Sequence, residues 1–232
     1  EICACLVGSE MCIRDRDTAV TEAINGRIVH AGQACCSSKR FIVQENIYDE
    51  FAGRLAERLK GMKIGDPLDQ GSRIGPLIDE RAAQRVEEIV DRTVKAGAYC
   101  LCGGRRFDGN FFEPTVLTGV TPAMDIAQNL EVFGPVFPLI KFKTEEQAVA
   151  IADNCTYGLS SGVISGEIQR AIRVARQLDA GNCTINGTGL YRTHDMPFGG
   201  HRKSGLGTEG LYATLDEFTK TKTYVWKGAA IR

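Results

Sequence analysis

The chain has 232 residues, of which 43% are hydrophobic and 25% charged, and its formal net charge is −1 at pH 7. This balance is typical of a globular protein with one large or two small domains, and it gives no electrostatic reason to expect nucleic acid or an anionic membrane as a partner. No apolar run approaches the ~20 residues that a membrane-spanning helix requires.

The cysteines are numerous and oddly spaced. There are nine, and six of them lie in three close sets. This spacing fits neither a small disulfide scaffold nor a zinc site built from two separated pairs, and only three histidines are available to complete a metal cluster. We therefore expect no metal site. No secretory segment precedes the cysteines, so we expect reduced thiols and a cytoplasmic location. The positions are Cys3, Cys5, Cys12, Cys35, Cys36, Cys100, Cys102, Cys155 and Cys183.

Residues 1–14 differ from the rest of the chain. They contain three of the nine cysteines and show neither helical nor strand periodicity. The tract from Cys5 to Arg16 is similar to translated sequencing-adapter read-through. We therefore expect residues 1–14 to be a non-native tail and the chain to be a fragment of a longer protein.

Regular structure is expected from residue 15 onward. Asp17 is placed to cap a helix that Gly32 ends, and a strand is predicted over 41–44. The next helix is predicted over 47–62, with Asn46 in the capping position.

Helices and strands then alternate along the chain. This order predicts an α/β fold, with an open, mostly parallel sheet and flanking helices, over residues 15–218. The last strand has no helix after it, so we expect residues 219–232 to leave the domain and pair with another sheet edge. The later helices are predicted at 79–96, 145–154, 167–178 and 209–217, and the later strands at 98–102, 114–117, 136–142, 159–165, 183–186 and 221–226.

Two adjacent thiols, Cys35 and Cys36, lie between a glycine-led turn and the strand 41–44. A free cysteine is usually a small buried hydrophobe. The alternative is a nucleophile, which requires a thiolate stabilised by local dipoles or by a base. His194 is a candidate base, but nothing in the sequence brings it near Cys35. Residue type alone leaves both interpretations open.

Glu131 and Phe133 precede a Gly-Pro turn and the strand 136–142. The simpler interpretation is a turn in which Gly-Pro only ends one element before the next. Alternatively, the carboxylate could hold a sugar hydroxyl and the aromatic ring could lie against a flat ligand ring.

Two other motifs are interpreted structurally. Residues 205–210 match the pattern GxGxxG, but no hydrophobic strand precedes them and no acid follows about twenty residues later, so a turn before the last helix is favoured over a nucleotide site. Cys100 and Cys102 are expected on one face of a strand, as buried thiols rather than metal ligands.

Four motifs, taken in order, resemble the aldehyde dehydrogenase superfamily over about residues 15–227. Gly-Gln-Ala-Cys-Cys at 32–36 is similar to the family's nucleophile segment, and Glu-Val-Phe-Gly-Pro-Val at 131–136 to its E-x-F-G-P-V segment. Asn186 matches the asparagine that opens the substrate loop. Pro-Phe-Gly-Gly followed by Ser-Gly, at 197–205, matches PFGG-x-x-x-SG.

The resemblance implies a reaction at Cys35. This nucleophile would attack an aldehyde to give a thiohemiacetal, with the oxyanion held partly by the Cys35 backbone N–H. Hydride would pass to NAD or NADP and leave a thioester, which water or, in some relatives, coenzyme A would release. Glu131 would contact the nicotinamide ribose, and Phe133 would lie beside the nicotinamide.

The resemblance also bears on the substrate and on assembly. Tyr191 and Phe198 are expected to line the aldehyde tunnel, and Arg192 or His194 could bind an anionic substrate such as a semialdehyde. The terminal strand implies a homodimer or homotetramer of the full-length protein.

Some family features do not match. The Rossmann cofactor domain and the oxyanion-hole asparagine precede this region in the family. The family's spacing between the general-base glutamate and the nucleophile places that glutamate at Glu1 in this chain. The residues after Glu1 do not fit the family segment, so the role of general base is not carried over. We therefore expect an inactive fragment of an enzyme. The alternatives are a non-catalytic fragment that only folds or oligomerises, and a thiol redox or metal protein.

Overall fold

The computed structural model describes residues 3–7 and 13–228, with side chains from residue 16 onward. Its centre is a seven-stranded sheet. All neighbouring strands are parallel except the last two, which are antiparallel. The predicted open, mostly parallel α/β sheet is therefore confirmed. In sheet order the strands are β10 (Asn182–Ile185), β9 (Ser160–Ile164), β1 (Cys3–Val7), β2 (Ser38–Gln44), β7 (Val136–Phe142), β6 (Thr115–Val120) and β3 (Tyr99–Cys102).

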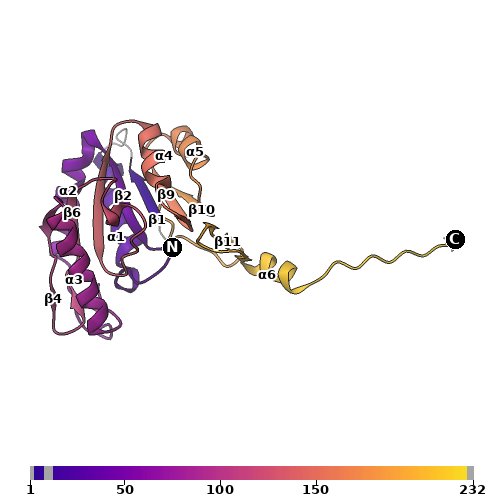
Figure 1. The fold of residues 1–232 in the computed structure, drawn as a ribbon, viewed down its shortest axis with the longest axis horizontal. Helices are drawn as coiled ribbons and strands as arrows, with labels where there is room; N and C mark the ends of the chain where they lie inside the picture. The colour runs from indigo at the N-terminus through magenta and orange to yellow at the C-terminus, as the bar shows by residue number, and fades with distance from the viewer. Residues whose placement is uncertain (1–2, 8–12, 229–232) are drawn as a thin grey trace.

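The helices connect these strands and pack beside the sheet (Figure 1). Three two-stranded ribbons complete the structure. The helices are α1 (Ile13–Ile28), η1 (Val29–Gly32), α2 (Glu45–Lys60), α3 (Glu80–Lys95), η2 (Asp125–Ala127), α4 (Glu145–Asp153), α5 (Ile168–Ala175) and α6 (Leu211–Phe218). The ribbons pair β4 (Arg106–Phe107) with β5 (Phe111–Phe112), β8 (Tyr157–Gly158) with β12 (His201–Arg202), and β11 (Phe198–Gly199) with β13 (Thr208–Glu209).

Side-chain caps mark the starts of α2 and α3. Asp79 caps α3 by accepting a hydrogen bond from the Ala82 backbone N–H at 2.7 Å. The prediction that Asn46 caps α2 was wrong, because α2 begins at Glu45. Gln44 is the cap, and its Oε1 accepts a hydrogen bond from the Asn46 N–H at 2.8 Å.

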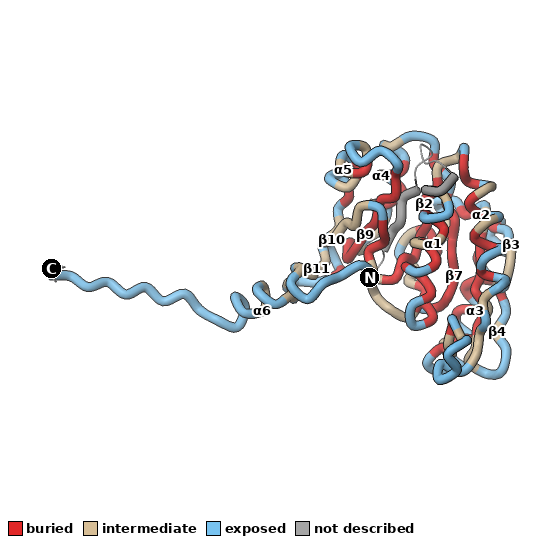
Figure 2. The backbone as a smooth tube through the Cα atoms, turned by 180° about the vertical axis from the view of Figure 1, so that it is seen from behind, coloured by how far each residue is buried: buried red, intermediate tan, exposed pale blue. Residues whose placement is uncertain are grey.

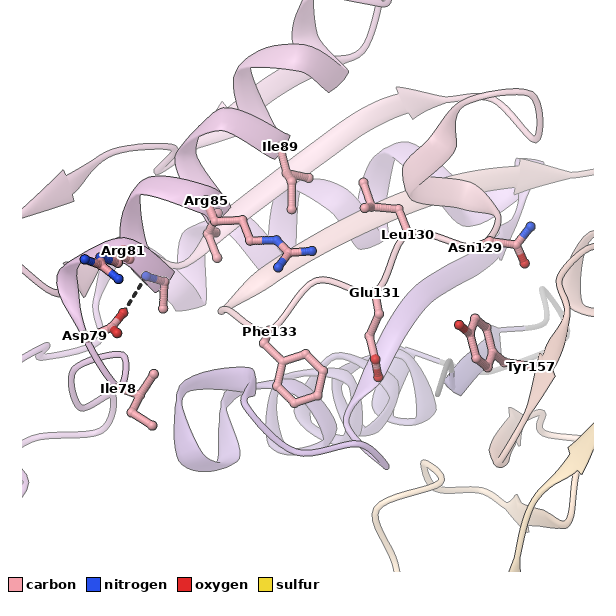
Figure 3. Close-up of a pocket in the computed structure, with 12 residues that line it drawn as sticks. Ile78, Asp79, Arg81, Arg85, Ile89, Asn129, Leu130, Glu131, Phe133 and Tyr157 are labelled. Atoms are coloured by element: carbon pink, nitrogen blue, oxygen red, sulfur yellow. Dashed lines mark hydrogen bonds between the residues drawn. The ribbon is translucent and has the colours of Figure 1, made fainter. Parts of the chain in front are cut away.

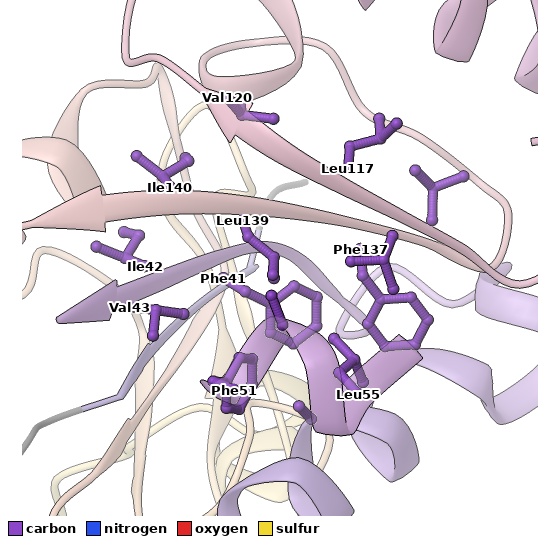
Figure 4. Packing of buried hydrophobic residues seen from close by; sticks show 14 of the residues in the cluster. Phe41, Ile42, Val43, Phe51, Leu55, Leu117, Val120, Phe137, Leu139 and Ile140 are labelled. Atoms are coloured by element: carbon purple, nitrogen blue, oxygen red, sulfur yellow. The ribbon is translucent and has the colours of Figure 1, made fainter. Parts of the chain in front are cut away.

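Strand β2 is buried on both sides of the sheet. Phe41 stacks on Phe137 of β7 at 5.3 Å between ring centroids, and Phe51 and Leu55 of α2 lie with them in the core (Figure 4). The neighbouring residue Arg40 is also fully buried. Because successive strand residues face opposite sides, it lies on the other face, where it donates to backbone carbonyls of α4.

The N-terminal residues gave one unexpected element. The segment 3–7, in which no periodicity was found, forms β1 between β9 and β2. Central parallel strands are covered on both faces, so their sequences lack the alternation that identifies a half-buried strand. Residues 1–2 and 8–12 lie outside the described part, and the non-native origin of residues 1–14 stays a prediction.

The C-terminal residues leave the domain. Residues 219–228 extend away from the sheet and are exposed (Figures 1 and 2). The strand predicted at 221–226 has no paired strand within the described residues. Helix α6 begins directly after Gly210, so the GxGxxG segment does precede the last helix as predicted. It is not a turn alone, because its residues Thr208–Glu209 form β13, which pairs with β11. Among the described helices, none is both long and apolar enough for a membrane span.

Candidate active site

Two loops singled out by the sequence lead into neighbouring strands. The cysteine turn, residues 32–37, precedes β2, and the Glu131 loop, residues 131–135, precedes β7. Because β2 and β7 pair in parallel, both loops lie at the end of the sheet where these two strands begin. The topology therefore brings Cys35 and Glu131 to the same end of the sheet.

Glycines let the two loops touch. Gly32 has a left-handed φ of 78°, and a Cβ atom there would clash with the carbonyl oxygen of Gly134. A Cβ atom on Gly134 would in turn lie 2.8 Å from the side chain of Val86 on α3. The turn before Gly32 is also left-handed, with φ of 51° at His30 and 53° at Ala31. Non-glycine residues adopt this conformation only where the surroundings hold them there.

Arg27, at the end of α1, ties the two loops together. Its guanidinium is fully buried. It donates to the carbonyls of Val132 and Val136, both at 2.8 Å, and to Ser37 Oγ at 3.2 Å. The planar fork of an arginine suits this arrangement, since several donors point in fixed directions. One side chain thus fixes the Glu131 loop against the end of the cysteine turn.

Lys39 lies between the predicted site residues. Its ammonium donates to the carbonyls of Ala34 at 2.6 Å, Ser37 at 3.0 Å and Cys35 at 3.4 Å. The same Nζ atom is 4.0 Å from Glu131 Oε1 and 4.8 Å from the centre of the Phe133 ring. Cys35, Glu131 and Phe133 are therefore grouped around one cation. Sequence reasoning overlooked both Lys39 and Arg27.

Gln33, the second residue of the Gly-Gln motif, anchors the cysteine turn on its other side. Its Oε1 accepts a hydrogen bond from the Ile78 N–H at 2.8 Å, and its Nε2 donates to the His30 carbonyl at 2.9 Å. Ile78 belongs to the segment that leads into α3. The turn that carries Cys35 is thus held from α1, from the segment before α3, and from β2.

A cavity of about 650 Å³ opens beside Glu131 and Phe133 (Figure 3). Arg81 and Arg85 line it from α3, and Tyr157 lines it from β8. Phe133 is 39% exposed. The full lining is Ile78, Asp79, Arg81, Ala82, Arg85, Val86, Ile89, Asn129, Leu130, Glu131, Phe133 and Tyr157.

The donor set of this cavity fits a dinucleotide. Its volume is in the usual range for cofactor sites. The Glu131 carboxylate can accept hydrogen bonds from sugar hydroxyls, and the exposed Phe133 ring offers a flat apolar surface. Arg81 and Arg85 supply guanidinium groups, which suit phosphate oxygens.

The Pro-Phe-Gly-Gly motif lies at the same end of the sheet. Strand β12 follows it directly and pairs with β8, just before β9 begins. Gly181, just before β10, packs so closely on Gly199 that a Cβ would clash with the Gly199 carbonyl. In the sheet, β9 is two strands from β2, which corresponds to about 10 Å.

The predicted substrate residues lie in and beside this motif. Tyr191 is 63% exposed. Phe198 lies under the guanidinium of Arg192, at 4.2 Å from its ring centre, and Arg192 is also paired with Glu209 at 2.8 Å. His194 is exposed, and its carbonyl accepts a hydrogen bond from Leu211 at the start of α6. A substrate tunnel lined by Tyr191 and Phe198 stays a prediction.

The Cys100–Cys102 pair departs from expectation in one respect. The strand register shifts between the two residues, which face Leu117 and Val116 in turn, so they do not follow the simple alternation that places them on one face. Both are half-buried, and burial raises the pKa of the Cys100 thiol and the pKa of the Cys102 thiol. Their thiols are therefore poorly suited to nucleophilic chemistry.

Comparison with known proteins identifies the family. The sequence pattern of the aldehyde dehydrogenase family matches residues 10–224. A lactaldehyde dehydrogenase of Methanococcus maripaludis is 37% identical over 215 residues, which are 92% of this chain and 46% of that protein. A succinate-semialdehyde dehydrogenase [NADP(+)] of Deinococcus radiodurans is 42% identical over 210 residues, 90% of this chain and 44% of that protein.

Solved structures agree. The crystal structure of an NAD-dependent aldehyde dehydrogenase from Sinorhizobium meliloti superposes with a TM-score of 0.91 at 36% identity, covering 100% of this chain and 46% of that one. This chain thus spans about half the length of the relatives it matches. The chain belongs to the aldehyde dehydrogenase family.

Proposed function

We propose that this chain is the catalytic region of an NAD(P)-dependent aldehyde dehydrogenase that oxidises an aldehyde to a carboxylate through Cys35. The observation that supports it most is the grouping of Cys35, Glu131 and Phe133 around Lys39, at the edge of a cavity lined by two arginines. The names of similar proteins agree, since they include lactaldehyde and NADP-dependent succinate-semialdehyde dehydrogenases.

In this proposal the Cys35 thiolate attacks the aldehyde carbon, which forms a carbon–sulfur bond and an oxyanion. The Cys35 backbone N–H helps to hold that oxyanion. Glu131 holds ribose hydroxyls, Phe133 flanks the nicotinamide, and Arg81 and Arg85 pair with phosphates. A bound NAD or NADP would serve as the hydride acceptor. Hydrolysis of the thioester on Cys35 releases the acyl group as a carboxylate. Acyl-coenzyme A among the products would instead indicate acyl transfer to coenzyme A.

We propose a semialdehyde or another anionic aldehyde as the substrate. Arg192 is half-exposed beside Phe198, and its present partner, Glu209, is an exposed carboxylate that a substrate carboxylate could replace. Similar proteins are named for succinate semialdehyde, glutarate semialdehyde and sulfoacetaldehyde. Arg192→Gln should raise the KM for succinate semialdehyde and leave the KM for propanal unchanged. An equal change for both substrates would contradict this assignment.

We also propose that the full-length protein is a cytoplasmic homodimer or homotetramer, in which residues 219–228 pair with a second copy. The extended, exposed course of these residues supports the pairing. This chain alone is proposed to be inactive, because its relatives are about twice its length. NADH formed by this chain from propanal and NAD would contradict that.

The test of function uses the full-length protein. Cys35→Ser should lower turnover by at least about a thousandfold, as removal of a nucleophile does in other enzymes. Affinity for NAD or NADP should remain largely unchanged. Cys36→Ser is the matched control, because it removes the adjacent thiol, and it should retain turnover. Retained turnover in Cys35→Ser would refute Cys35 as the nucleophile.

A further inference from the structure

Lys39 is an unusual residue at the start of β2. Only 1% of its side chain is exposed. Burying an ammonium costs free energy unless polar groups replace the lost water. Three backbone carbonyls, those of Ala34, Cys35 and Ser37, replace that water, and all three belong to the cysteine turn. Lys39 therefore holds the turn from inside.

Two further neighbours of the ammonium, Glu131 and Phe133, belong to the cofactor side of the site. An ammonium has three N–H donors, which matches the three carbonyl acceptors. At 4.0 Å, the interaction with Glu131 Oε1 is one of charge rather than a hydrogen bond. The Phe133 ring, at 4.8 Å, is within cation–π range. The N–H groups thus hold the cysteine turn while the charge acts on Glu131 and Phe133.

The neighbouring cation shows that burial alone does not create this arrangement. Arg40 is also 1% exposed, but it faces the other side of β2 and donates to the carbonyls of Ile151 and Ala152 in α4. Its contacts join the sheet to a helix. Those of Lys39 join the loop that carries Cys35 to the loop that carries Glu131.

We propose that Lys39 is a positioning residue, which sets the cysteine turn in register with Glu131 and Phe133 and so aligns the nucleophile with the nicotinamide side of the cofactor. The proposal rests on the proposed function. Lys39 itself contacts neither substrate nor cofactor in this scheme. Its effect on the cofactor is transmitted through Glu131, and that dependence distinguishes it from a residue that merely fills the core.

The test is a double-mutant cycle on the full-length protein, with the dissociation constant of NAD or NADP measured by calorimetry. Lys39→Met should weaken binding about fivefold, which corresponds to roughly 1 kcal/mol of binding free energy. In a Glu131→Gln background the same change should weaken binding less than about twofold, because the charge it positions is gone. Equal effects in both backgrounds would overturn the proposal.

A second variant and a second measurement guard against loss of folding. Lys39→Gln removes the charge but keeps two N–H donors for the turn carbonyls, and it should show the same dependence on Glu131. Alkylation of Cys35 by iodoacetamide, mapped by peptide mass spectrometry without cofactor, should change in rate in Lys39→Met, because the turn that carries Cys35 loses the hydrogen bonds from Lys39 Nζ. Lys141→Met is the control, since it removes a lysine that lies 4.5 Å from the Tyr48 ring, outside the site.

The two proposals fail in different ways. If the full-length protein neither binds NAD or NADP nor oxidises aldehydes, the proposed function fails and the cofactor role of Lys39 fails with it. If the protein is active but Lys39→Met and Lys39→Gln act independently of Glu131, or if Cys35 alkylates in Lys39→Met as fast as in Lys141→Met, only the role of Lys39 fails.

Discussion

Replacing Arg27 with methionine should destabilise the protein strongly. The guanidinium is completely buried and donates hydrogen bonds to the carbonyls of Val132 and Val136 and to Ser37 Oγ. Hydrogen bonds from a charged donor contribute about 1.5–3 kcal/mol each, and the two carbonyls cannot follow the side chain out of the core. Because a methionine fills part of the volume, we expect a loss of about 3–5 kcal/mol in the free energy of unfolding.

Urea denaturation of this chain, followed by circular dichroism, measures that loss. With a denaturant dependence of roughly 3 kcal/mol per molar, the midpoint should fall by more than about 1 M. Arg58→Met is the matched control, since it removes an exposed arginine that donates to Thr21 Oγ1 at 2.7 Å, and it should cost less than about 1 kcal/mol. Equal losses in the two variants would refute the claim that Arg27 holds the two loops together.

Three further predictions, two substitutions and one reactivity measurement, probe separate features. Gly32→Ala should cost at least about 2 kcal/mol of unfolding free energy, measured by urea denaturation, because its φ is 78° and a Cβ would meet a carbonyl of the Glu131 loop. The hydrogen bond with His201 lowers the pKa of the half-exposed Asp179, so Asp179→Asn should cost less than about 1 kcal/mol at pH 7. That loss should disappear on acidification. A carboxyl whose pKa is lowered by folding stabilises the protein above its ordinary pKa of about 3.9, and this stabilisation is lost as the pH falls through the pKa of the folded state. Cys100 and Cys102, whose pKa values burial raises, should react with iodoacetamide at pH 7 more slowly than a thiol peptide, and faster reaction in the folded chain would contradict their burial.

Most of the fold could be predicted because its elements are marked by local signals. Strand β7 was expected at its observed bounds, and the helix expected over 79–96 is observed as α3, Glu80–Lys95. The errors occur where local signals are weak. Strand β1 is central and shows no alternation. The bulge in β3 depends on pairing with β6, and a single strand's sequence does not record its partner's register.

The site, like the fold, could be predicted only in part from the sequence. The resemblance of four ordered motifs to those of the aldehyde dehydrogenase family singled out Cys35, Glu131 and Phe133. The structure groups these three residues around Lys39. The cations that organise them could not be found from spacing, because Arg27 meets the Glu131 loop across more than a hundred residues of chain. One signal was available. Lys39 and Arg40 directly precede the apolar residues 41–43 within β2, and buried cations are rare unless they are paired.

The central claim is that Cys35 carries the acyl group during aldehyde oxidation. The full-length protein can be mixed with an aldehyde and NAD or NADP, quenched in acid and digested, and the acylated peptide sequenced by mass spectrometry. The account predicts a thioester on Cys35 and none on the adjacent Cys36. An acyl group on Cys36, or turnover with no acyl group on Cys35, would contradict it.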